Sequence, residues 1–237
     1  MLINTNHRRN DAEIMDDFAL SGRELGDALD KIALINRILG GNRLTLQGVR
    51  KLVKYRKADK TIKILDIGCG NGDMLRALAD EAGKMNRKLQ LKGVDANAYT
   101  IEHARRLSEN YPAISYECRD IFSETYVQEP VDIILCTLTL HHFSEEQIVR
   151  LLTMFRQQSK LGIVINDLQR SAVAYYLFKV VAVLMRLNKM ATEDGLLSIL
   201  RGFKRKELAD FAEKLNFKKY SIRRRWAFRF QWIIWIS

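Results

Sequence analysis

The sequence predicts a doubly wound α/β fold, in which helices cover both faces of a mostly parallel sheet. From residue 61 onward, short apolar runs that suit buried strands alternate with segments of helical periodicity. A glycine-rich turn joins the first run to a helix. The segments 218–225 and 228–236 alternate between apolar and polar residues, so we expect them to form a hairpin at the end of the sheet.

Seven strands are expected in this sheet. They are predicted at 62–67, 89–94, 114–119, 131–136, 161–166, 218–225 and 228–236. Helices are predicted at 74–82, at about 98–108, after Ser144, and at 205–215. Asn97 is the expected N-cap of the second of these helices. Ser144 and Gln147 have the spacing of a capping box for the third.

Helices are also predicted before the first strand. Apolar residues recur at helical spacing from Ile14 to about Leu39. Ser21 and Glu24 have the spacing of a capping box for the second part of this segment. A shorter helix is predicted from residue 45 to about residue 55, with its apolar side chains on one face.

Composition limits the class of protein. A chain of 237 residues with 47% hydrophobic residues can bury a sizeable core. The three cysteines, Cys69, Cys118 and Cys136, are odd in number and lack C-x-x-C spacing, so disulfides are not expected. The polar N-terminus shows no apolar signal-peptide core, and we expect a cytoplasmic protein.

The net charge of +11 is spread unevenly along the chain. Residues 11–30 carry seven acidic and one basic side chain, whereas residues 201–237 carry eleven basic and three acidic ones. The basic C-terminal region could steer an anionic partner toward the protein. Solvated charges on helices and on an edge strand explain the pattern equally well.

The stretch TIKILDIGCGNGD, residues 61–73, has the clearest chemical meaning. Its three glycines, Gly68, Gly70 and Gly72, suit a turn that needs positive φ and a close backbone approach to a ligand. The helix that follows would point free N–H groups at that ligand. Asp66 stands two residues before the first glycine, in what we expect to be the turn, and the glycine spacing differs from the usual dinucleotide-binding pattern.

With the later segment GVDANAYTIEHAR, this stretch resembles motifs I and II of class I S-adenosylmethionine (SAM)-dependent methyltransferases. The overall layout is similar to small-molecule methyltransferases of quinone and polyketide-type pathways. The resemblance covers residues 61–167 strongly and the C-terminal third by layout only. It implies a Rossmann-like methyltransferase fold with seven strands, SAM as cofactor and S-adenosylhomocysteine (SAH) as product.

The resemblance also implies which residues bind the cofactor. The acidic residue of the turn, Asp66, would contact the amino-acid end of SAM. Asp95, at the end of the second strand, would bind the ribose hydroxyls. Asp120 would accept from the adenine amine, while Ile121 packs on the ring. The full predicted set is Asp66, Gly68, Cys69, Gly70, Gly72, Asp95, Ala96, Asp120, Ile121 and Cys136.

Two adjacent histidines, His141 and His142, follow the fourth strand and are the candidate catalytic residues. A neutral imidazole could take a hydroxyl proton during methyl transfer, and His141 is the first choice. Many members of the family carry an L-H-H turn in which the histidines are mainly structural. No metal is expected, because no carboxylate or further histidine lies at ligand spacing.

The chain should divide into a helical cap, residues 1–58, and a SAM-binding domain, residues 59–237. An insertion at about 170–203 follows the fifth strand, where the family places substrate-binding elements. Within it, the apolar segment 171–187 allows three interpretations. It could be a core or homodimer-interface helix, one wall of a pocket for a greasy substrate, or a helix on a membrane surface. It is too short and too charged for a good transmembrane segment.

Three charged residues outside the motifs allow two interpretations each. Arg43 could reach the carboxylate of SAM, or it could be solvated. Asp194 and Arg201 could line the substrate pocket, or they could form a structural ion pair.

The predicted activity is methyl transfer to a small hydrophobic or aromatic acceptor, with oxygen favoured over carbon because of the two histidines. Two alternatives stay open. Arg223, Arg224, Arg225 and Trp226 suggest a nucleic-acid methyltransferase, although the tetrapeptide typical of many amino-methylating enzymes is absent after the fourth strand. The other alternative is a non-catalytic SAM-binding or scaffold protein.

Overall fold

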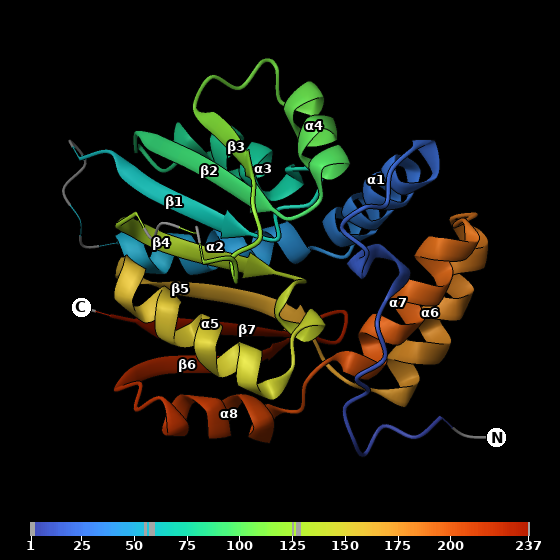
Figure 1. Cartoon of the computed structure of the whole chain (residues 1–237). Coiled ribbons are helices and arrows are strands. Elements are labelled where there is room, and N and C mark those ends of the chain that lie inside the picture. The colour runs from blue at the N-terminus through green and yellow to red at the C-terminus, as the bar shows by residue number, and fades with distance from the viewer. Residues whose placement is uncertain (1–2, 55, 57–59, 125, 127–128, 237) are drawn as a thin grey trace.

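A seven-stranded sheet lies at the centre of the protein, as the sequence predicts. The computed structural model describes residues 3–54, 56, 60–124, 126 and 129–236. The strand order is β3-β2-β1-β4-β5-β7-β6, and β7 runs antiparallel to both of its neighbours (Figure 1). The strands are β1 (Ile62–Ile67), β2 (Leu89–Asp95), β3 (Ile114–Cys118), β4 (Val131–Thr137), β5 (Ser159–Leu168), β6 (Lys219–Arg225) and β7 (Arg229–Trp235).

Eight α-helices and two short 3-10 helices are found in the described part of the chain. The α-helices are α1 (Arg23–Ile38), α2 (Gly41–Val53), α3 (Asp73–Ala82), α4 (Ala98–Leu107), α5 (Glu145–Gln158), α6 (Ala172–Leu184), α7 (Lys189–Arg201) and α8 (Arg205–Lys214). The 3-10 helices are η1 (Ile14–Asp16) and η2 (Leu140–His142).

The predicted caps of two helices are confirmed, and a third is wrong. The Asn97 side chain accepts from the backbone N–H of Thr100, and Ser144 with Gln147 forms a capping box. Ser21 does not cap α1, because Gly22 is its N-cap and makes no side-chain bond. The segment 14–39, in which the sequence predicts a second helix beginning near Ser21, contains two helical elements, η1 and α1, separated by an irregular segment.

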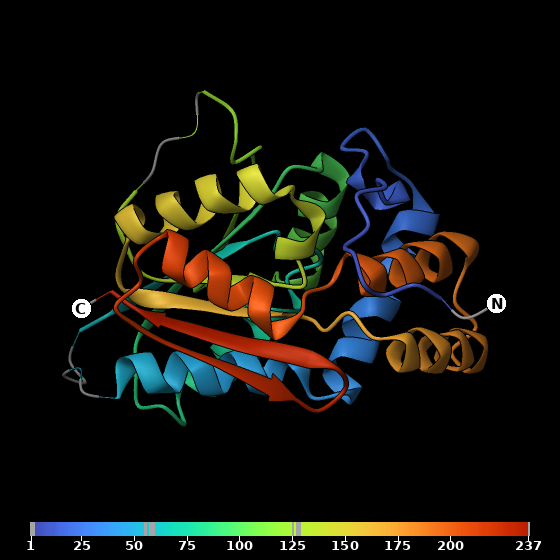
Figure 2. The ribbon, with the colours of Figure 1, turned by 90° about the horizontal axis from the view of Figure 1, so that it is seen from below.

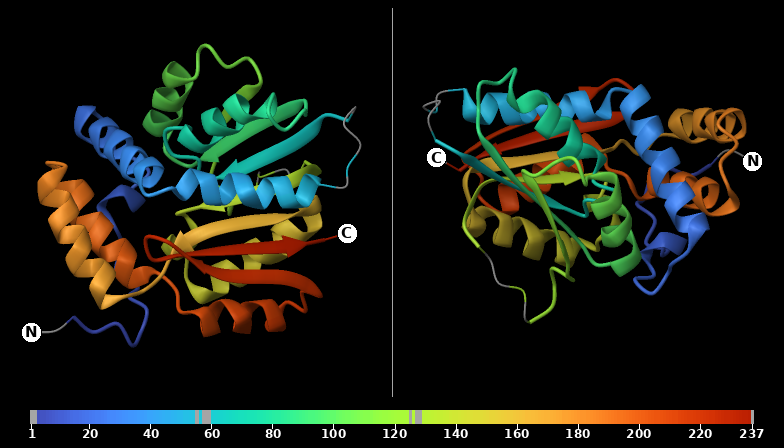
Figure 3. Two further views of the ribbon diagram at one scale, coloured as in Figure 1. Left: turned by 180° about the vertical axis from the view of Figure 1, so that it is seen from behind. Right: turned by 90° about the horizontal axis from the view of Figure 1, so that it is seen from above.

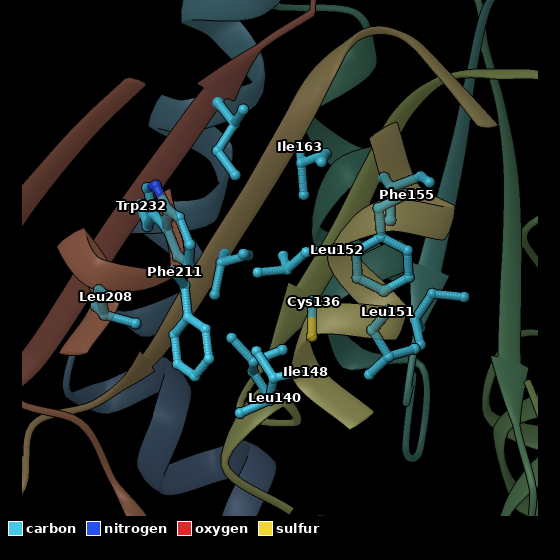
Figure 4. Close-up of a cluster of buried hydrophobic side chains, with 14 of the residues drawn as sticks. Cys136, Leu140, Ile148, Leu151, Leu152, Phe155, Ile163, Leu208, Phe211 and Trp232 are labelled. Atoms are coloured by element: carbon cyan, nitrogen blue, oxygen red, sulfur yellow. The ribbon is translucent and has the colours of Figure 1, made fainter. Parts of the chain in front are cut away.

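Helices cover both faces of the sheet (Figure 2). Side chains of α2, α3 and α4 join the apolar cluster on one face, and side chains of α5 and α8 join the cluster on the other. Figure 4 shows the second cluster, which includes Leu152 and Phe155 of α5 and Trp232 of β7. This two-sided burial explains why the central strands are continuous apolar runs.

The cap consists of the N-terminal segment, α1, α6 and α7, which gather at the carboxyl ends of the parallel strands (Figures 1 and 3). The α2 helix is not part of it, since α2 packs on the sheet, where a Cβ on Gly48 would lie 2.5 Å from Val164. The predicted cap over residues 1–58 is therefore too long at its C-terminal end. The boundary itself, residues 57–59, lies outside the described residues, as does Tyr55, where the predicted helix ends.

The α6 helix is not a core helix, because only Ala174 and Ala182 are buried within it. Its exposed side includes several large apolar residues, among them Val183 at 77% exposure and Leu184 at 75%. Other residues of α6 face the cavity described below. No helix in the described part of the chain is long and apolar enough to span a membrane. A homodimer and contact with a membrane surface remain predictions for this helix.

Candidate functional site

A cavity of about 820 Å³ lies between the cap and the carboxyl ends of the strands. Its floor is formed by the glycine turn and by the ends of β2, β4 and β5. Its walls come from residues 13–39, from α6 and α7, and from the turn between β6 and β7. Because it brings together most of the predicted site residues, this cavity is the candidate active site.

The glycine turn forms the part of the cavity floor at the carboxyl end of β1. Gly68 and Gly70 line the cavity with φ of +67° and +52°. A Cβ on Gly68 would lie 2.3 Å from the Thr139 side chain, so only glycine fits there. Gly72 does not line the cavity. It is glycine because φ is +78° and a Cβ would lie 2.0 Å from the Tyr116 hydroxyl.

Asp66 is placed by β1 itself rather than by the turn, contrary to expectation. It pairs with Gly93 of β2 and Leu135 of β4, and it is 1% exposed. Its Oδ1 has no hydrogen-bond partner within the described residues, although Asp66 lines the cavity. Burial, followed by the nearby charge of Asp95, raises the pKa of Asp66 to about 7. A cationic ligand group at this carboxylate would satisfy it.

Asp95 ends β2 and connects the glycine turn to the start of α4. Its Oδ2 accepts from the Gly70 backbone N–H at 3.1 Å, and its Oδ1 accepts from the Asn97 backbone N–H at 3.1 Å. Burial raises the pKa of Asp95 in spite of these bonds. The carboxylate is therefore held in a fixed orientation at the edge of the cavity.

The remaining predicted cofactor residues divide into two groups. Cys69, Ala96, Asp120 and Ile121 all line the cavity. Asp120 accepts from the Phe122 backbone N–H at 2.8 Å and is exposed, whereas Ile121 is buried.

Cys136 lies elsewhere. It is fully buried in the cluster between the sheet and α5, and it is not a cavity residue (Figure 4). Cys136 belongs to the core because its side chain points to the α5 face of β4. The next three residues, Thr137, Leu138 and Thr139, line the cavity instead.

His141 is buried at 2% exposure beside the tip of β5. Its Nδ1 lies 2.6 Å from Asp167 Oδ1, and its backbone N–H donates to Asp167 Oδ2 at 3.2 Å. Burial opposes ionisation of Asp167, but the charge and hydrogen bond of His141 hold the pKa of this carboxyl below its usual value. The Nε2 atom of His141 has no hydrogen-bond partner among the residues described.

His142 is held by the N-terminal segment. Its Nδ1 lies 2.6 Å from Asp16 Oδ1, while Arg201 Nη1 donates to Asp16 Oδ2 at 2.7 Å. Burial opposes ionisation of Asp16, but the hydrogen bond and charge of His142 lower its pKa well below the usual value. The Arg201 side chain also donates to the carbonyls of His141 and His142. His142 is thus part of the contact between cap and sheet.

Glu13 is the acidic neighbour of both histidines. Its Oε1 lies 3.8 Å from His141 Nε2 and 3.8 Å from His142 Nδ1, and Ser198 donates to its Oε2 at 2.8 Å. Burial raises the pKa of Glu13 to about 7. Glu13, His141 and His142 each offer one ligand atom, and these three atoms lie within 4.8 Å of one another, so they could hold a metal ion. No carboxylate stands at ligand spacing from the histidines in the sequence, but the fold brings Glu13 to them.

Sequence reasoning missed four residues of this site. Glu13 and Asp16 lie more than 120 positions before the histidines and carry no local motif. Asp167 could have been found, because the carboxyl ends of neighbouring parallel strands meet at one edge of a sheet. Arg229 could have been noticed as a charge at the start of an otherwise apolar strand.

The three charged residues with open interpretations have structural or solvated positions. Arg43 is exposed and is not among the cavity residues. Asp194 accepts from the backbone N–H groups of Ile14 and Met15 at 2.7 and 2.9 Å. Asp194 and Arg201 both hold the N-terminal segment, but they form no ion pair with each other within the described structure.

Residues 64–162 match the family model described as methyltransferase domain. This part of the chain is therefore similar to a methyltransferase domain. The matched segment begins in β1 and ends in β5, so it includes Asp66, Asp95, Asp120 and both histidines. This match and the seven-stranded fold confirm the predicted resemblance.

Curated relatives are similar to part of the chain. A ubiquinone biosynthesis O-methyltransferase of Coxiella burnetii is 32% identical over 99 residues, which is 40% of this chain and 40% of the relative. A ribosomal RNA large subunit methyltransferase G of Vibrio vulnificus is 34% identical over 112 residues, which is 44% of this chain and 27% of the relative. The chain thus spans less than half the length of these relatives.

Solved structures resemble almost the whole chain. The plantazolicin methyltransferase BpumL in complex with SAH covers 90% of this chain and 96% of its own, with a TM-score of 0.65 and 16% identity. The magnesium protoporphyrin IX methyltransferase ChlM of Synechocystis PCC 6803 with bound SAM covers 86% and 84%, with a TM-score of 0.56 and 13% identity. These similarities confirm the predicted Rossmann-like fold of the chain.

Proposed function

We propose that this protein transfers a methyl group from SAM to a hydroxyl of a small hydrophobic or aromatic acceptor. One observation carries the proposal. The same cavity is lined by Asp66, at the end of β1, and His141, beside β5; Asp66 Oδ1 and His141 Nε2 have no hydrogen-bond partner within the described residues. The first suits the cationic end of SAM, and the second suits an acceptor hydroxyl.

The residues at the β1 end of the cavity fit SAM. Asp66 would bind the ammonium group, Asp95 the ribose hydroxyls, and Asp120 with Ile121 the adenine. The open glycine turn would admit the cofactor, because a Cβ on Gly70 would have no neighbour closer than 4.0 Å. When bound, SAM supplies a sulfonium methyl group that needs no further activation.

His141 would serve as the general base. The ionised Asp167 accepts from Nδ1–H, which fixes the tautomer in which Nε2 carries the lone pair. Nε2 can then take the hydroxyl proton, and Asp167 stabilises the imidazolium that results. A carbon acceptor of the quinone type remains the alternative. If a ring proton must be removed from such an acceptor, His141 oriented by Asp167 would serve equally well as the base.

The remaining cavity walls favour a hydrophobic acceptor. They are mostly apolar and come from α1, α6 and α7, for example Leu25, Leu29, Ile32, Leu177, Phe178, Val181 and Ile199. This use of α6 supports the pocket-wall interpretation of the apolar segment. The ubiquinone O-methyltransferase relative and the natural-product methyltransferases of similar fold act on small molecules according to their names, which agrees with this acceptor class.

The first experiment measures cofactor binding and then turnover. Isothermal titration with SAM and SAH would be followed by a tritiated-methyl assay on phenols, quinols, polyketide-like acids and tRNA. We expect both ligands to bind and the label to enter an organic-extractable product. Failure of the protein to bind SAM or SAH would contradict the proposal. Label in tRNA would favour a nucleic-acid substrate, and binding without any turnover would favour a scaffold role.

A matched pair of variants sharpens this experiment. Asp95→Ala should weaken SAH binding by roughly 10- to 100-fold, the scale of lost charge-assisted hydrogen bonds. Asp210→Ala, which removes an exposed carboxylate on α8, should leave the affinity unchanged. Equal affinities in the two variants would overturn the placement of the ribose.

A further inference from the structure

Arg229 is a buried cation without an ionic partner. It is the first residue of β7 and is 3% exposed. Its Nε and Nη1 atoms have no hydrogen-bond partner among the described residues. No carboxylate in the described structure lies within 4.0 Å of its guanidinium nitrogens. By contrast, the equally buried Arg170 forms an ion pair with Glu207 at 2.5 Å.

Arg229 lines the same cavity as the histidines, together with Trp226, Ala227 and Phe228 of the hairpin turn. Burial lowers the pKa of Arg229 to about 10, so the side chain still carries its charge at neutral pH. A buried charge is costly unless it is paired, which indicates that this arginine is kept for a ligand.

The position of Arg229 separates it from the cofactor end of the cavity. It pairs with Leu168 of β5, next to the Asp167 that orients His141. The order β1-β4-β5-β7 puts three strand spacings between Asp66 and Arg229, or about 14 Å at 4.8 Å per spacing. A group bound at Arg229 would thus lie beyond the candidate base, on the acceptor side.

We propose that Arg229 binds a carboxylate of the acceptor, so that the substrate is a hydroxylated hydrophobic acid. Calling this ligand the acceptor rests on the proposed function. A guanidinium presents planar N–H donors that match a carboxylate. The cavity lining also includes Arg119, but that residue follows β3 at the cofactor end. Arg229 therefore balances one negative charge at the acceptor end, which favours a carboxylate over a phosphate dianion.

The experiment compares acids with their amides, which differ in charge but hardly in shape. Three pairs serve as probes: a hydroxybenzoate, a hydroxynaphthoate and a ten-carbon hydroxy acid, each with its primary amide. Isothermal titration into the SAH-saturated wild-type protein should show at least one acid binding about tenfold or more tighter than its amide. Arg229→Met should abolish this preference and leave SAH affinity unchanged.

Two further variants make the result decisive. Arg224→Met removes an exposed arginine from the neighbouring strand β6 and should keep the full preference for the acid. Arg229→Lys keeps the charge but loses the planar donors, so it should keep a reduced preference, and it provides the comparison if Arg229→Met does not fold.

Acids and amides that bind the wild-type protein alike, absence of binding included, would overturn the proposal. An acid preference that survives in Arg229→Met would do the same. If the wild-type protein does not bind SAH, the proposed function fails, but titration of the probes without SAH still tests Arg229. The two failures are therefore distinguishable.

Discussion

Asp66 and Asp95 bring two carboxyl groups to the ends of neighbouring strands. Neither forms an ion pair in the described structure, and burial raises the pKa of both. In the protein without ligand, Asp66 is therefore about half protonated near neutral pH. A ligand that carries an ammonium group favours the ionised form, so its binding releases a proton from Asp66.

This coupling predicts a pH-dependent affinity for SAH. Because the pKa of free Asp66 is raised to about 7, protonation competes with binding below pH 7. Affinity should rise roughly tenfold from pH 6 to pH 8, as expected for one such proton. Isothermal titration across this range measures the effect. Asp66→Asn should bind SAH more weakly and show a flat profile, whereas a flat profile in the wild-type protein would contradict the assignment.

The two histidines should differ in their contribution to turnover. His141→Gln should lower kcat by about 100- to 10,000-fold, the range expected for loss of a general base. Asp167→Asn should lower it less, because the imidazole remains but loses its orienting acceptor. Steady-state kinetics with SAH affinity as the control separate these effects. A His142→Gln variant that loses as much kcat as His141→Gln would show that the base is assigned to the wrong residue.

Metal removal should leave methyl transfer unchanged, although Glu13, His141 and His142 lie close enough to share an ion. Arg201 Nη1 lies 3.6 Å from Glu13 Oε1 and already supplies positive charge to this cluster. Dialysis against EDTA and 1,10-phenanthroline, followed by the methyl-transfer assay and metal analysis, checks this expectation. Activity that is lost on dialysis and returns with one divalent metal would contradict it.

At the scale of elements, the cap is attached by polar contacts between segments far apart in the chain. Asp194 of α7 accepts hydrogen bonds from the backbone N–H groups at the start of η1. Arg201 of α7 donates to Asp16 and to the backbone carbonyls of His141 and His142. Few buried apolar residues hold the N-terminal segment. The position of this segment over the cavity therefore depends on α7.

Arg201→Met should lower the free energy of unfolding by about 2–3 kcal/mol. The reason is that Asp16 and two backbone carbonyls lose their buried donor. Arg43→Met, at an exposed position of α2, is the control and should change it by less than about 0.5 kcal/mol. Urea denaturation followed by circular dichroism gives both values. A loss in Arg201→Met no larger than that in the control would show that the contact carries little stability.

At the scale of the whole molecule, the sequence predicts the sheet, and most of the candidate cofactor residues line one cavity. The central strands are compact apolar runs, and Asp66, Asp95 and Asp120 lie at or just beyond the carboxyl ends of β1, β2 and β3, so local order determines where they lie. The acceptor end is different. Glu13 reaches His141 only because the cap folds back over the sheet, and no spacing in the sequence encodes that contact.

The sequence also does not show where α2 packs. Its apolar face predicts a helix that packs on something, but the same face would suit either the cap or the sheet. Tertiary packing of Gly48 against Val164 decides for the sheet. The exposed apolar residues on α6 show a second limit of the sequence. An apolar segment suggests burial, but the sequence does not show which of its side chains are exposed.

The insertion of β7 between β5 and β6 has a consequence for synthesis. The strand that completes the sheet, β7, is the last strand in the described chain. During translation the edge of β5 therefore stays unpaired, and β6 has no strand to pair with, until β7 has been synthesised. Arg229 opens that final strand. The acceptor end of the cavity is therefore completed last, and a nascent chain can contain the whole cofactor floor before its acceptor site is complete.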